Sequence, residues 1–168
     1  MLKEQTYPIA KDYIENYSME PHIEGGFFKE TYRSSKNFPV YKDGEKFKRF
    51  TICSYILSRG EKSVFHKLLV GDEIWSYQAG GRLVLHEISA KGIYKKILLG
   101  PNIHEGEVLN YVVVSGNWMA AELEDNEEFA VSSCIVVPGF EFTDWVAGNR
   151  EDLIALCPEA LGVVERLT

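Results

Sequence analysis

Apolar and polar residues alternate along the middle of the chain in the manner of β-strands. Between about Gly26 and Val146, runs of roughly five to eight residues are rich in Val, Ile, Thr, Tyr and Phe. Turn-forming dipeptides such as Asp43-Gly44 and Lys91-Gly92 separate these runs. We count about nine or ten strands and no crossover helix between them, so the pattern predicts an antiparallel all-β sandwich or barrel.

Short helices are predicted on both sides of this region. Thr6 can cap a first helix, whose apolar residues at helical spacing are Ile9, Tyr13, Ile14 and Tyr17. Asn149 can cap a second helix, which Pro158 ends or follows with a further short helix. The side chains expected to face inward from this last piece are Leu161, Val164 and Leu167.

Length and composition place the chain among folded proteins of one domain. A chain of 168 residues with 45% hydrophobic and 26% charged residues can bury a core, and we expect one domain over 1–168, with its barrel at about 26–146. The formal net charge of −7 argues against binding nucleic acid or an anionic membrane.

Cysteine use and hydropathy indicate a cytoplasmic protein. Cys53, Cys134 and Cys157 are widely spaced in apolar runs, as expected of buried thiols in a reducing compartment. The longest apolar stretches are too short to cross a membrane, and the N-terminal residues lack the apolar core of a signal peptide.

The segment from Gly60 to Gly80 is the strongest candidate for chemistry. It predicts a hairpin that turns at Gly71-Asp72. Strand alternation gives each arm one common face: Val64, His66 and Leu68 on the first, and Glu73, Trp75 and Tyr77 on the second. If both faces point into a barrel, an imidazole and a carboxylate meet beside two aromatic rings. Such a pair suits a metal site, or a general base that a carboxylate orients.

The spacing Gly-x5-His-x-Leu-x4-Glu-x6-Gly in this hairpin is similar to the first motif of the cupin superfamily. The segment His22-Ile-Glu-Gly-Gly-Phe-Phe-Lys-Glu-Thr-Tyr-Arg-Ser34 resembles the N-terminal signature of a cupin family of unknown function. Asp72-Glu-Ile-Trp75 and Val137-Pro-Gly-Phe-Glu-Phe142 resemble later blocks of the same family. The resemblance covers about Tyr7 to Thr168. It implies a double-stranded β-helix (a jelly roll), usually dimeric, with a small-molecule cavity at its mouth.

Departures from the cupin pattern argue against a tightly bound metal. The resemblance implies three His and one Glu as metal ligands, but only His66 and Glu73 are retained, with Leu68 and Met119 at the other two positions. A thioether is a soft ligand that does not suit iron, manganese or zinc. We therefore expect no cofactor, and the alternative is a weakly held divalent metal at His66 and Glu73.

Other polar and aromatic residues have weaker claims to a functional role. His22 and Glu24 are interpreted as fixing the turn before Gly25-Gly26, or alternatively as lining a neighbouring subunit's cavity. The candidates for a proton-donating tyrosine are Tyr32, Tyr55 and Tyr77. His86 is interpreted as an ordinary strand residue, and His104 as a solvated loop residue.

The sequence therefore predicts a cupin-like protein, expected to be a homodimer, that binds a small polar or sugar-like metabolite. His66 and Glu73 are the candidate catalytic residues. The candidate ligand-binding residues are His66, Glu73, Trp75, Tyr77, Met119 and Tyr32. Whether the chain is an enzyme stays open: proton transfer by an epimerase or isomerase is one function. A non-catalytic binding or sensor module, a weakly metal-dependent cupin enzyme and a purely structural scaffold are the others.

Overall fold

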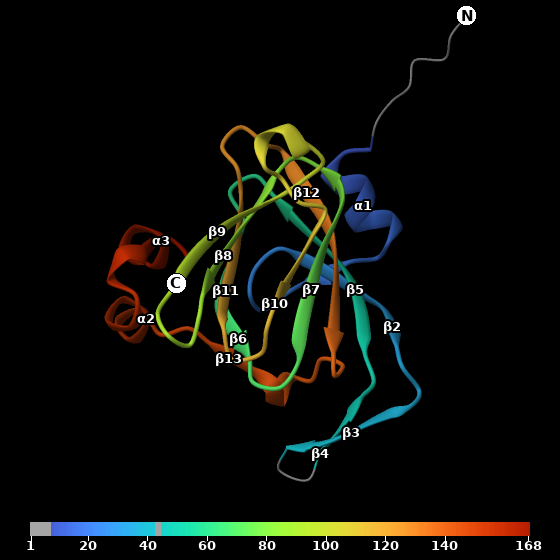
Figure 1. Cartoon of the computed structure of the whole chain (residues 1–168). Helices are drawn as coiled ribbons and strands as arrows, with labels where there is room; N and C mark the ends of the chain where they lie inside the picture. Colours follow the sequence, from blue (N-terminus) through green and yellow to red (C-terminus); the bar gives the residue numbers. More distant parts are fainter. Residues whose placement is uncertain (1–7, 43–44) are drawn as a thin grey trace, which may run out of the picture.

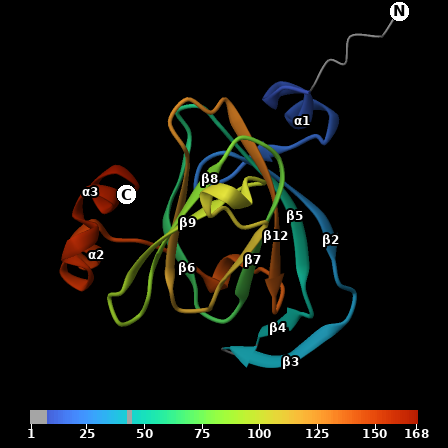
Figure 2. The ribbon, with the colours of Figure 1, turned by 45° about the horizontal axis from the view of Figure 1, so that its top comes forward.

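Two antiparallel sheets face each other and enclose the main core (Figures 1 and 2). The computed structural model describes residues 8–42 and 45–168. The first sheet has the order β1 (Glu20–Pro21), β2 (Phe27–Arg33), β5 (Thr51–Ser58), β12 (Phe129–Val137), β7 (Asp72–Gly80) and β10 (Asn110–Val113). The second has the order β13 (Trp145–Ala147), β6 (Lys62–Leu68), β11 (Trp118–Leu123), β8 (Leu83–Ile88) and β9 (Tyr94–Leu99). The all-β prediction is confirmed.

A hairpin of β3 (Asn37–Lys42) and β4 (Glu45–Lys48) projects away from the two sheets (Figure 1). The expected turn at Asp43-Gly44 lies outside the described residues. The expected turn at Lys91-Gly92 joins β8 to β9, where the backbone N–H of Ser89 donates to Ile93 at 2.9 Å. Two short 3-10 turns, Ile103–Glu105 and Phe142–Asp144, complete the loops.

The predicted alternation decides which side chains face the space between the sheets. On β7, Trp75 packs into the main core, and on β6, Leu68 does the same from the opposite sheet. All six residues of β8 are buried, because the outer face of this strand is covered as well.

The C-terminal helices cover the outer face of the second sheet. They are α2 (Arg150–Leu156) and α3 (Leu161–Arg166), with a 3-10 turn at Pro158–Ala160 between them. Asn149 caps α2 as predicted, because its Oδ1 accepts the N–H of Asp152 at 3.0 Å. Val164 and Leu167 are buried as expected, whereas the expectation for Leu161 is wrong, since this side chain is 44% exposed.

The N-terminal helix α1 (Ala10–Asn16) covers the outer face of the first sheet. Its Tyr13 and Ile14 pack on a small cluster that contains Met19, Ile56 and Val131. The expected cap at Thr6 lies outside the described residues. No described helix has both the length and the apolar character needed to cross a membrane.

Candidate functional site

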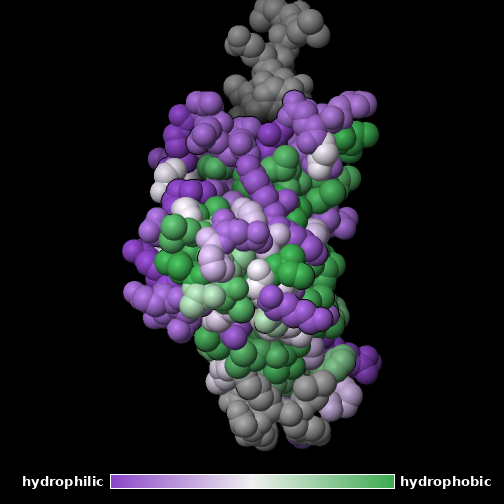
Figure 3. Space-filling view, turned by 60° about the vertical axis from the view of Figure 1, so that its left-hand side comes forward, coloured by the Kyte–Doolittle hydropathy of each residue, from purple (hydrophilic) through white to green (hydrophobic). Residues whose placement is uncertain are grey.

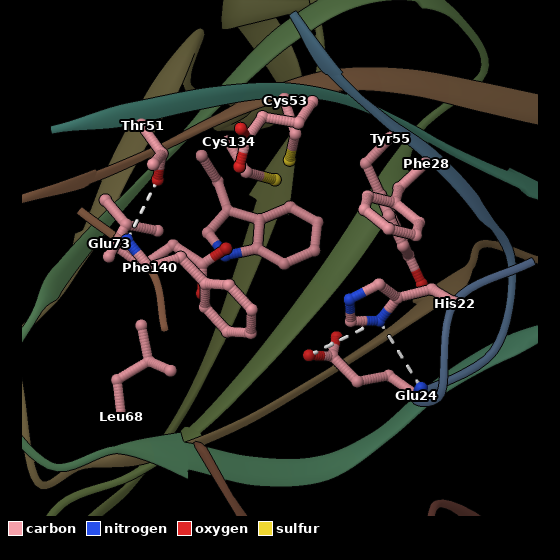
Figure 4. A pocket seen from close by; sticks show the side chains of 13 residues that line it. His22, Glu24, Phe28, Thr51, Cys53, Tyr55, Leu68, Glu73, Cys134 and Phe140 are labelled. Carbon is pink, nitrogen blue, oxygen red and sulfur yellow. Dashed lines mark hydrogen bonds and ion pairs between the residues drawn. The ribbon is translucent and has the colours of Figure 1, made fainter. Parts of the chain in front are cut away.

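A cavity opens between the two sheets, near the connection from β1 to β2 (Figure 4). Its volume is about 50 Å³, which is room for a few water molecules. Aromatic and carboxylate side chains dominate the lining, which consists of His22, Glu24, Phe28, Glu30, Thr51, Cys53, Tyr55, Leu68, Glu73, Trp75, Cys134, Val136 and Phe140.

Gly25 and Gly26 allow the chain to place His22 and Glu24 over this cavity. Gly25 has a φ of +107°, and a Cβ atom there would lie 2.0 Å from the carbonyl oxygen of Lys62. Gly26 has a φ of +68°. Only glycine adopts such conformations at so close an approach without strain. The interpretation of His22 and Glu24 as turn residues is therefore incomplete, because both also line the cavity of their own chain.

Glu24 is the centre of the polar network at one end of the cavity. Ser63 Oγ donates to its Oε2 at 3.0 Å, and Trp145 Nε1 donates to its Oε1 at 3.0 Å. His66 Nε2 lies 3.3 Å from Oε1. His66 does face inward from β6, as predicted, but the carboxylate that it contacts is Glu24 and not Glu73.

Both ring nitrogens of His66 are engaged. Its Nδ1 lies 2.8 Å from the carbonyl oxygen of Val64, which can only accept, so Nδ1 carries a proton. Its other nitrogen, Nε2, lies within ion-pair distance of the Glu24 carboxyl group. His66 is 1% exposed and does not line the cavity, so in this structure it positions Glu24.

His22 has a ring nitrogen that faces the cavity. Its Nδ1 accepts the backbone N–H of Glu24 at 3.4 Å and lies 3.6 Å from Glu24 Oε1. The other nitrogen, Nε2, has no hydrogen-bond partner among the described residues, and Figure 4 shows it directed into the cavity. Burial lowers the pKa of His22 and outweighs the opposing effect of the nearby Glu24 carboxylate. His22 is therefore a neutral imidazole at neutral pH.

Glu73 is a buried acid that stays protonated at neutral pH. Burial raises its pKa from the ordinary value of 4.5 to about 8, and the negative charge of Glu24 adds to this effect. Trp75 follows two positions later on β7, and its Nε1 is buried. The indole of Trp75 and the thiol of Cys134 are close enough to the Glu73 carboxyl group to act as its hydrogen-bond partners, and both limit the rise of its pKa.

The other residues predicted to bind a ligand lie in different places. Tyr77 donates from its hydroxyl group to the carbonyl of Gly80 at 2.7 Å, and Met119 is buried in the main core; neither lines the cavity. Tyr32 is 49% exposed and stacks on Phe50 outside the cavity. Of the three candidate tyrosines, only Tyr55 reaches the lining, and its hydroxyl group donates to the carbonyl of Gly25 at 2.7 Å.

The two remaining histidines lie away from the cavity. His86 sits beneath the C-terminal helices, where its ring nitrogens lie 2.8 Å from the Tyr94 hydroxyl and 3.0 Å from Glu122. Its interpretation as an ordinary strand residue agrees with this position. His104 is exposed in the 3-10 turn before Gly106.

The donor set does not suit the metal centre that the cupin pattern implies. His66 and Glu73 are not paired, and Leu68 replaces a ligand with a hydrocarbon. Within residues 8–42 and 45–168, no three His, Cys, Asp or Glu side chains are grouped so as to hold a metal ion. We therefore derive no step through a metal.

Comparison with known proteins identifies the family. The family model described as Cupin superfamily (DUF985) matches residues 11–147. The chain belongs to this family. The uncharacterized protein YML079W of Saccharomyces cerevisiae is similar to it, with 31% identity over 153 residues, covering 83% of this chain and 75% of the yeast protein.

Solved structures agree with this membership of the DUF985 cupin family. A hypothetical protein from Leishmania major has 26% identity and a TM-score of 0.88, covering 96% of this chain and 99% of that one. Protein SO0799 from Shewanella oneidensis has 30% identity and a TM-score of 0.86, covering 96% and 98%. The capsular polysaccharide assembling protein CapF from Staphylococcus aureus shares only the fold, with 13% identity and a TM-score of 0.57 over 86% of this chain and 32% of CapF. The jelly-roll prediction is confirmed.

Reasoning from the sequence missed the role of His22 and Glu24. Strand alternation indicates what faces inward within one hairpin, but these two residues arrive through a turn from a different part of the chain. The segment from His22 to Ser34, which carries the family resemblance, could have indicated this role. Its polar residues beside a double glycine are unusual for a plain strand.

Proposed function

We propose that this protein binds a small polar molecule in the barrel cavity, through His22, Glu24 and Glu73. The observation that carries the proposal is the protonated Glu73 carboxyl group, buried at the cavity wall beside Trp75 and Cys134, with no Lys or Arg among the described lining residues. Burying such groups costs free energy unless a bound molecule satisfies them. A purely structural barrel gains nothing from this arrangement.

The size of the cavity limits the ligand. Drug-sized ligand pockets occupy about 300–1,000 Å³, whereas this cavity has about 50 Å³. A molecule of a few heavy atoms fits best, and a whole sugar ring would require side chains to move. This narrows the expectation of a sugar-like metabolite towards smaller compounds.

Binding is tested by NMR titration with small neutral, cationic and anionic compounds. The indole N–H resonance of Trp75 reports on the cavity, because the indole lines it beside Glu73. We expect its shift to saturate with at least one compound, and Glu73→Leu to weaken that binding at least tenfold. Tyr32→Phe is the matched control outside the cavity. If no compound of any charge causes a saturable shift, the proposal is wrong.

A second candidate function is proton transfer, as in an epimerase or isomerase. It is favoured by the neutral His22, whose free Nε2 faces the same cavity as the protonated Glu73. His22 would take a proton at Nε2 from a carbon next to a carbonyl group, while Glu73 gives its proton to the carbonyl oxygen to form an enol. This step requires the ring tautomer whose proton is on Nδ1 and faces the Glu24 carboxylate 3.6 Å away, because the tautomer that accepts the Glu24 N–H at Nδ1 carries its proton on Nε2. Solvent water then gives a proton to the opposite face of that carbon while Glu73 takes back the enol proton, and His22 releases its proton to solvent, so the product is the epimer and both groups are restored. Here His22 takes the role that the sequence assigned to His66.

Hydrogen exchange into D₂O tests this second function. Small hydroxycarbonyl compounds such as glyceraldehyde are incubated with the protein, and loss of the C–H signal is followed by proton NMR. General acid–base catalysis contributes about 10²–10⁴-fold, so His22→Gln should reduce exchange by at least 100-fold, whereas His104→Gln at an exposed site should not. Exchange no faster than in buffer would exclude this function and leave the binding proposal intact.

The alternative of a weakly metal-dependent enzyme has a direct test. Dialysed protein is analysed by mass spectrometry for iron, manganese and zinc. We expect less than stoichiometric metal, because Leu68 and Met119 stand where ligands are needed and His66 is engaged by Glu24. Near-stoichiometric metal would support the metal-dependent enzyme.

The homodimer also remains a proposal. Within the described residues, β1 covers only the first two residues of β2, so the edge of β2 from Lys29 onwards is free to pair with a second chain. The β3–β4 hairpin projects beside this edge (Figure 1). Light scattering after gel filtration is expected to give about twice the mass of 19.1 kDa.

The surface around the C-terminal helices is less suited to a dimer contact than the edge of β2. Figure 3 shows this side of the molecule, where hydrophobic patches in the lower half are interrupted by hydrophilic side chains. Because the patches are divided by hydrophilic side chains, we place the proposed dimer contact at β2 and not here.

We further propose that the protein acts in the cytoplasm. Cys53, Cys134 and Cys157 are all free thiols. Free buried thiols are typical of proteins in reducing compartments. A fluorescent fusion imaged in the source cell tests this placement.

A further inference from the structure

We propose that Arg33 sets the size limit for molecules that enter the cavity, because it holds the two sides of the mouth together. One side of the mouth is β2. The other is the connection between β12 and β13, residues 138–144, which we call the β12–β13 loop. The inference deepens the proposed binding function and rests on it, but its test needs no ligand. Three observations carry it: the position of the mouth, a bulge in β2, and the hydrogen bonds of Arg33.

The mouth of the cavity lies between β2 and the β12–β13 loop. Most of the lining is buried, and the lining residues that reach solvent are His22, Phe28, Glu30, Cys53 and Phe140. Glu30, the most exposed of them, belongs to β2, whereas Phe140 belongs to the loop. The ring of Phe140 lies 6.5 Å from that of His22 (Figure 4). A molecule that enters the cavity must therefore pass between β2 and this loop.

A β-bulge in β2 turns Arg33 towards the mouth. The pairing of β2 with β5 shifts between Glu30 and Tyr32, so Thr31 is an extra residue. Strict alternation would point Tyr32 inward together with Glu30. The bulge instead turns Tyr32 outward, where it is 49% exposed, and brings Arg33 opposite Thr51, which lines the cavity. The same bulge explains why Tyr32, predicted to bind a ligand, lies outside the cavity.

The guanidinium group of Arg33 links β2 to the β12–β13 loop. On its own strand, its Nε and Nη2 donate to the two carboxylate oxygens of Glu30 at 2.9 and 2.8 Å. Across the mouth, its Nη1 donates to Glu141 Oε1 at 2.6 Å, and its Nη2 donates to the carbonyl of Phe140 at 3.1 Å. A planar guanidinium suits this arrangement, because its donors point in fixed directions. Arg33 thus holds one lining residue from each side, Glu30 and Phe140.

Two buried anchors hold the β12–β13 loop on either side of Phe140. At one end, the Asp144 carboxylate accepts two backbone N–H groups of the β6–β7 turn at 3.1 and 3.0 Å. At the other end, the N–H of Gly139 donates to the carbonyl of Lys48 at 2.8 Å. Between these anchors, the N–H of Phe140 donates to Thr51 Oγ1 at 3.0 Å, and the guanidinium group supplies the link to β2. Removing the guanidinium group should therefore loosen the mouth without unfolding the loop.

The link through Arg33 is weak enough to open and close. The side chains of Arg33, Glu30 and Glu141 are each 34–36% exposed. Ion pairs at this exposure contribute little to stability, because water competes for the same groups. A molecule of a few heavy atoms fits the cavity of about 50 Å³ with the link in place, whereas a larger one has to wait for the link to open. Arg33 is therefore a positioning residue that favours small molecules.

Cys53 is a natural reporter of the mouth. It lines the cavity, is partly exposed and lies opposite Glu30 on β5. Methyl methanethiolsulfonate and benzyl methanethiolsulfonate modify thiols by the same chemistry and differ in size. The rate at which each reagent modifies Cys53 is measured by mass spectrometry of peptides. Cys157, which is 1% exposed beneath the C-terminal helices, is the internal reference for unfolding of the whole domain.

Two variants remove the link from its two sides. In Arg33→Gln, the benzyl reagent should modify Cys53 faster by about fivefold or more, and the methyl reagent by less than about twofold. Glu141→Gln removes the partner across the mouth and should shift the two rates in the same direction. The double variant should be no faster than Arg33→Gln, because both changes break the same link.

Arg59→Gln is the matched control. Arg59 also pairs with a glutamate, Glu128, at 2.7 Å, and it donates to two loop carbonyls at 3.1 and 2.6 Å. It does not line the cavity. The Arg59→Gln variant should therefore leave the ratio of the two Cys53 rates unchanged.

The possible outcomes separate this inference from a purely structural role and from the proposed binding function. An unchanged benzyl rate in Arg33→Gln overturns the inference. Equal acceleration of both reagents, together with faster modification of Cys157, shows that Arg33 only stabilises the fold and also overturns it. Additive effects of Arg33→Gln and Glu141→Gln overturn the link between them. A negative NMR titration, in contrast, overturns the binding function and leaves the control of the mouth by Arg33 intact.

Discussion

The Glu73→Gln variant should be more stable than the natural protein at neutral pH. Below about pH 4.5, Glu73 is protonated in both the folded and the unfolded chain, so its titration contributes nothing. As pH rises from 4.5 to about 8, the unfolded chain releases this proton and the folded chain retains it, so the folded state loses stability. Glutamine cannot ionise and avoids this loss.

The size of the effect follows from the pKa of Glu73. Each pH unit between 4.5 and 8 costs ~1.4 kcal/mol, so the penalty is about 3 kcal/mol at pH 7 and about 5 kcal/mol at pH 8 and above. For a chain of this length, a gain of that order at pH 7 corresponds to roughly 6–12 °C in Tm. These are the upper values, because the amide of glutamine also has to fit among Cys134 and Trp75.

Urea unfolding at pH 4.5, 6, 7 and 8.5 measures the difference between the two proteins. The stability gain of Glu73→Gln should be near zero at the lowest pH, increase steadily, and level off above pH 8. Glu122→Gln is the control of opposite sign, because Arg166 lowers the pKa of Glu122 and this variant should lose stability at neutral pH. A Glu73→Gln difference that does not change with pH would refute the assignment of Glu73 as a buried protonated acid.

Three further predictions concern the frame of the site. Gly25→Ala should abolish ligand binding and lower Tm, because its Cβ atom would lie 2.0 Å from the Lys62 carbonyl oxygen. Gly60 also has a positive φ, of +84°, but a Cβ atom there would have nothing within 4 Å. Gly60→Ala should therefore keep ligand binding and lower the free energy of unfolding, measured with urea, by about 1–2 kcal/mol. Asn149→Ala should lower the free energy of unfolding by about 1 kcal/mol, since it removes the cap of α2, and an unchanged urea midpoint would contradict this. Cys134 should resist iodoacetamide at pH 7 in the folded protein, because burial raises the pKa of its thiol; rapid labelling detected by mass spectrometry would contradict this.

The fold could be predicted because its information is local. Alternating residues and turn dipeptides locate the strands, and the hairpin around Gly71 correctly places His66 and Glu73 on inward faces. The cap at Asn149 was equally readable, since a cap depends on residues three positions apart. Leu161 was misplaced because its helix begins in a 3-10 turn, which shifts the buried face towards Val164.

The pairing inside the barrel could not be predicted because it depends on distant segments. The partner of His66 is Glu24, which is brought across by the turn at Gly25, and no period of the sequence reports that approach. Likewise, Tyr77 is on the predicted face of β7. It lies so far along the strand that its hydroxyl group donates to the carbonyl of Gly80 and not to a ligand. Strand alternation thus indicates which face of a strand a side chain is on. How far along the barrel the side chain lies, and which residues it contacts, depend on the tertiary structure.

The strand that carries His66 is fixed along both of its edges. On one side β6 pairs with β11, and on the other it is bonded in turn by the backbone of Glu24, by Leu167 and by β13. Three separate pieces of chain would have to detach at once before this wall could move. A molecule larger than the resting cavity must therefore make its room by displacing β2 and the double-glycine turn. Amide exchange on binding should change there and at Val64, whose N–H donates to Glu24 in that turn, while the rest of β6 should be unchanged.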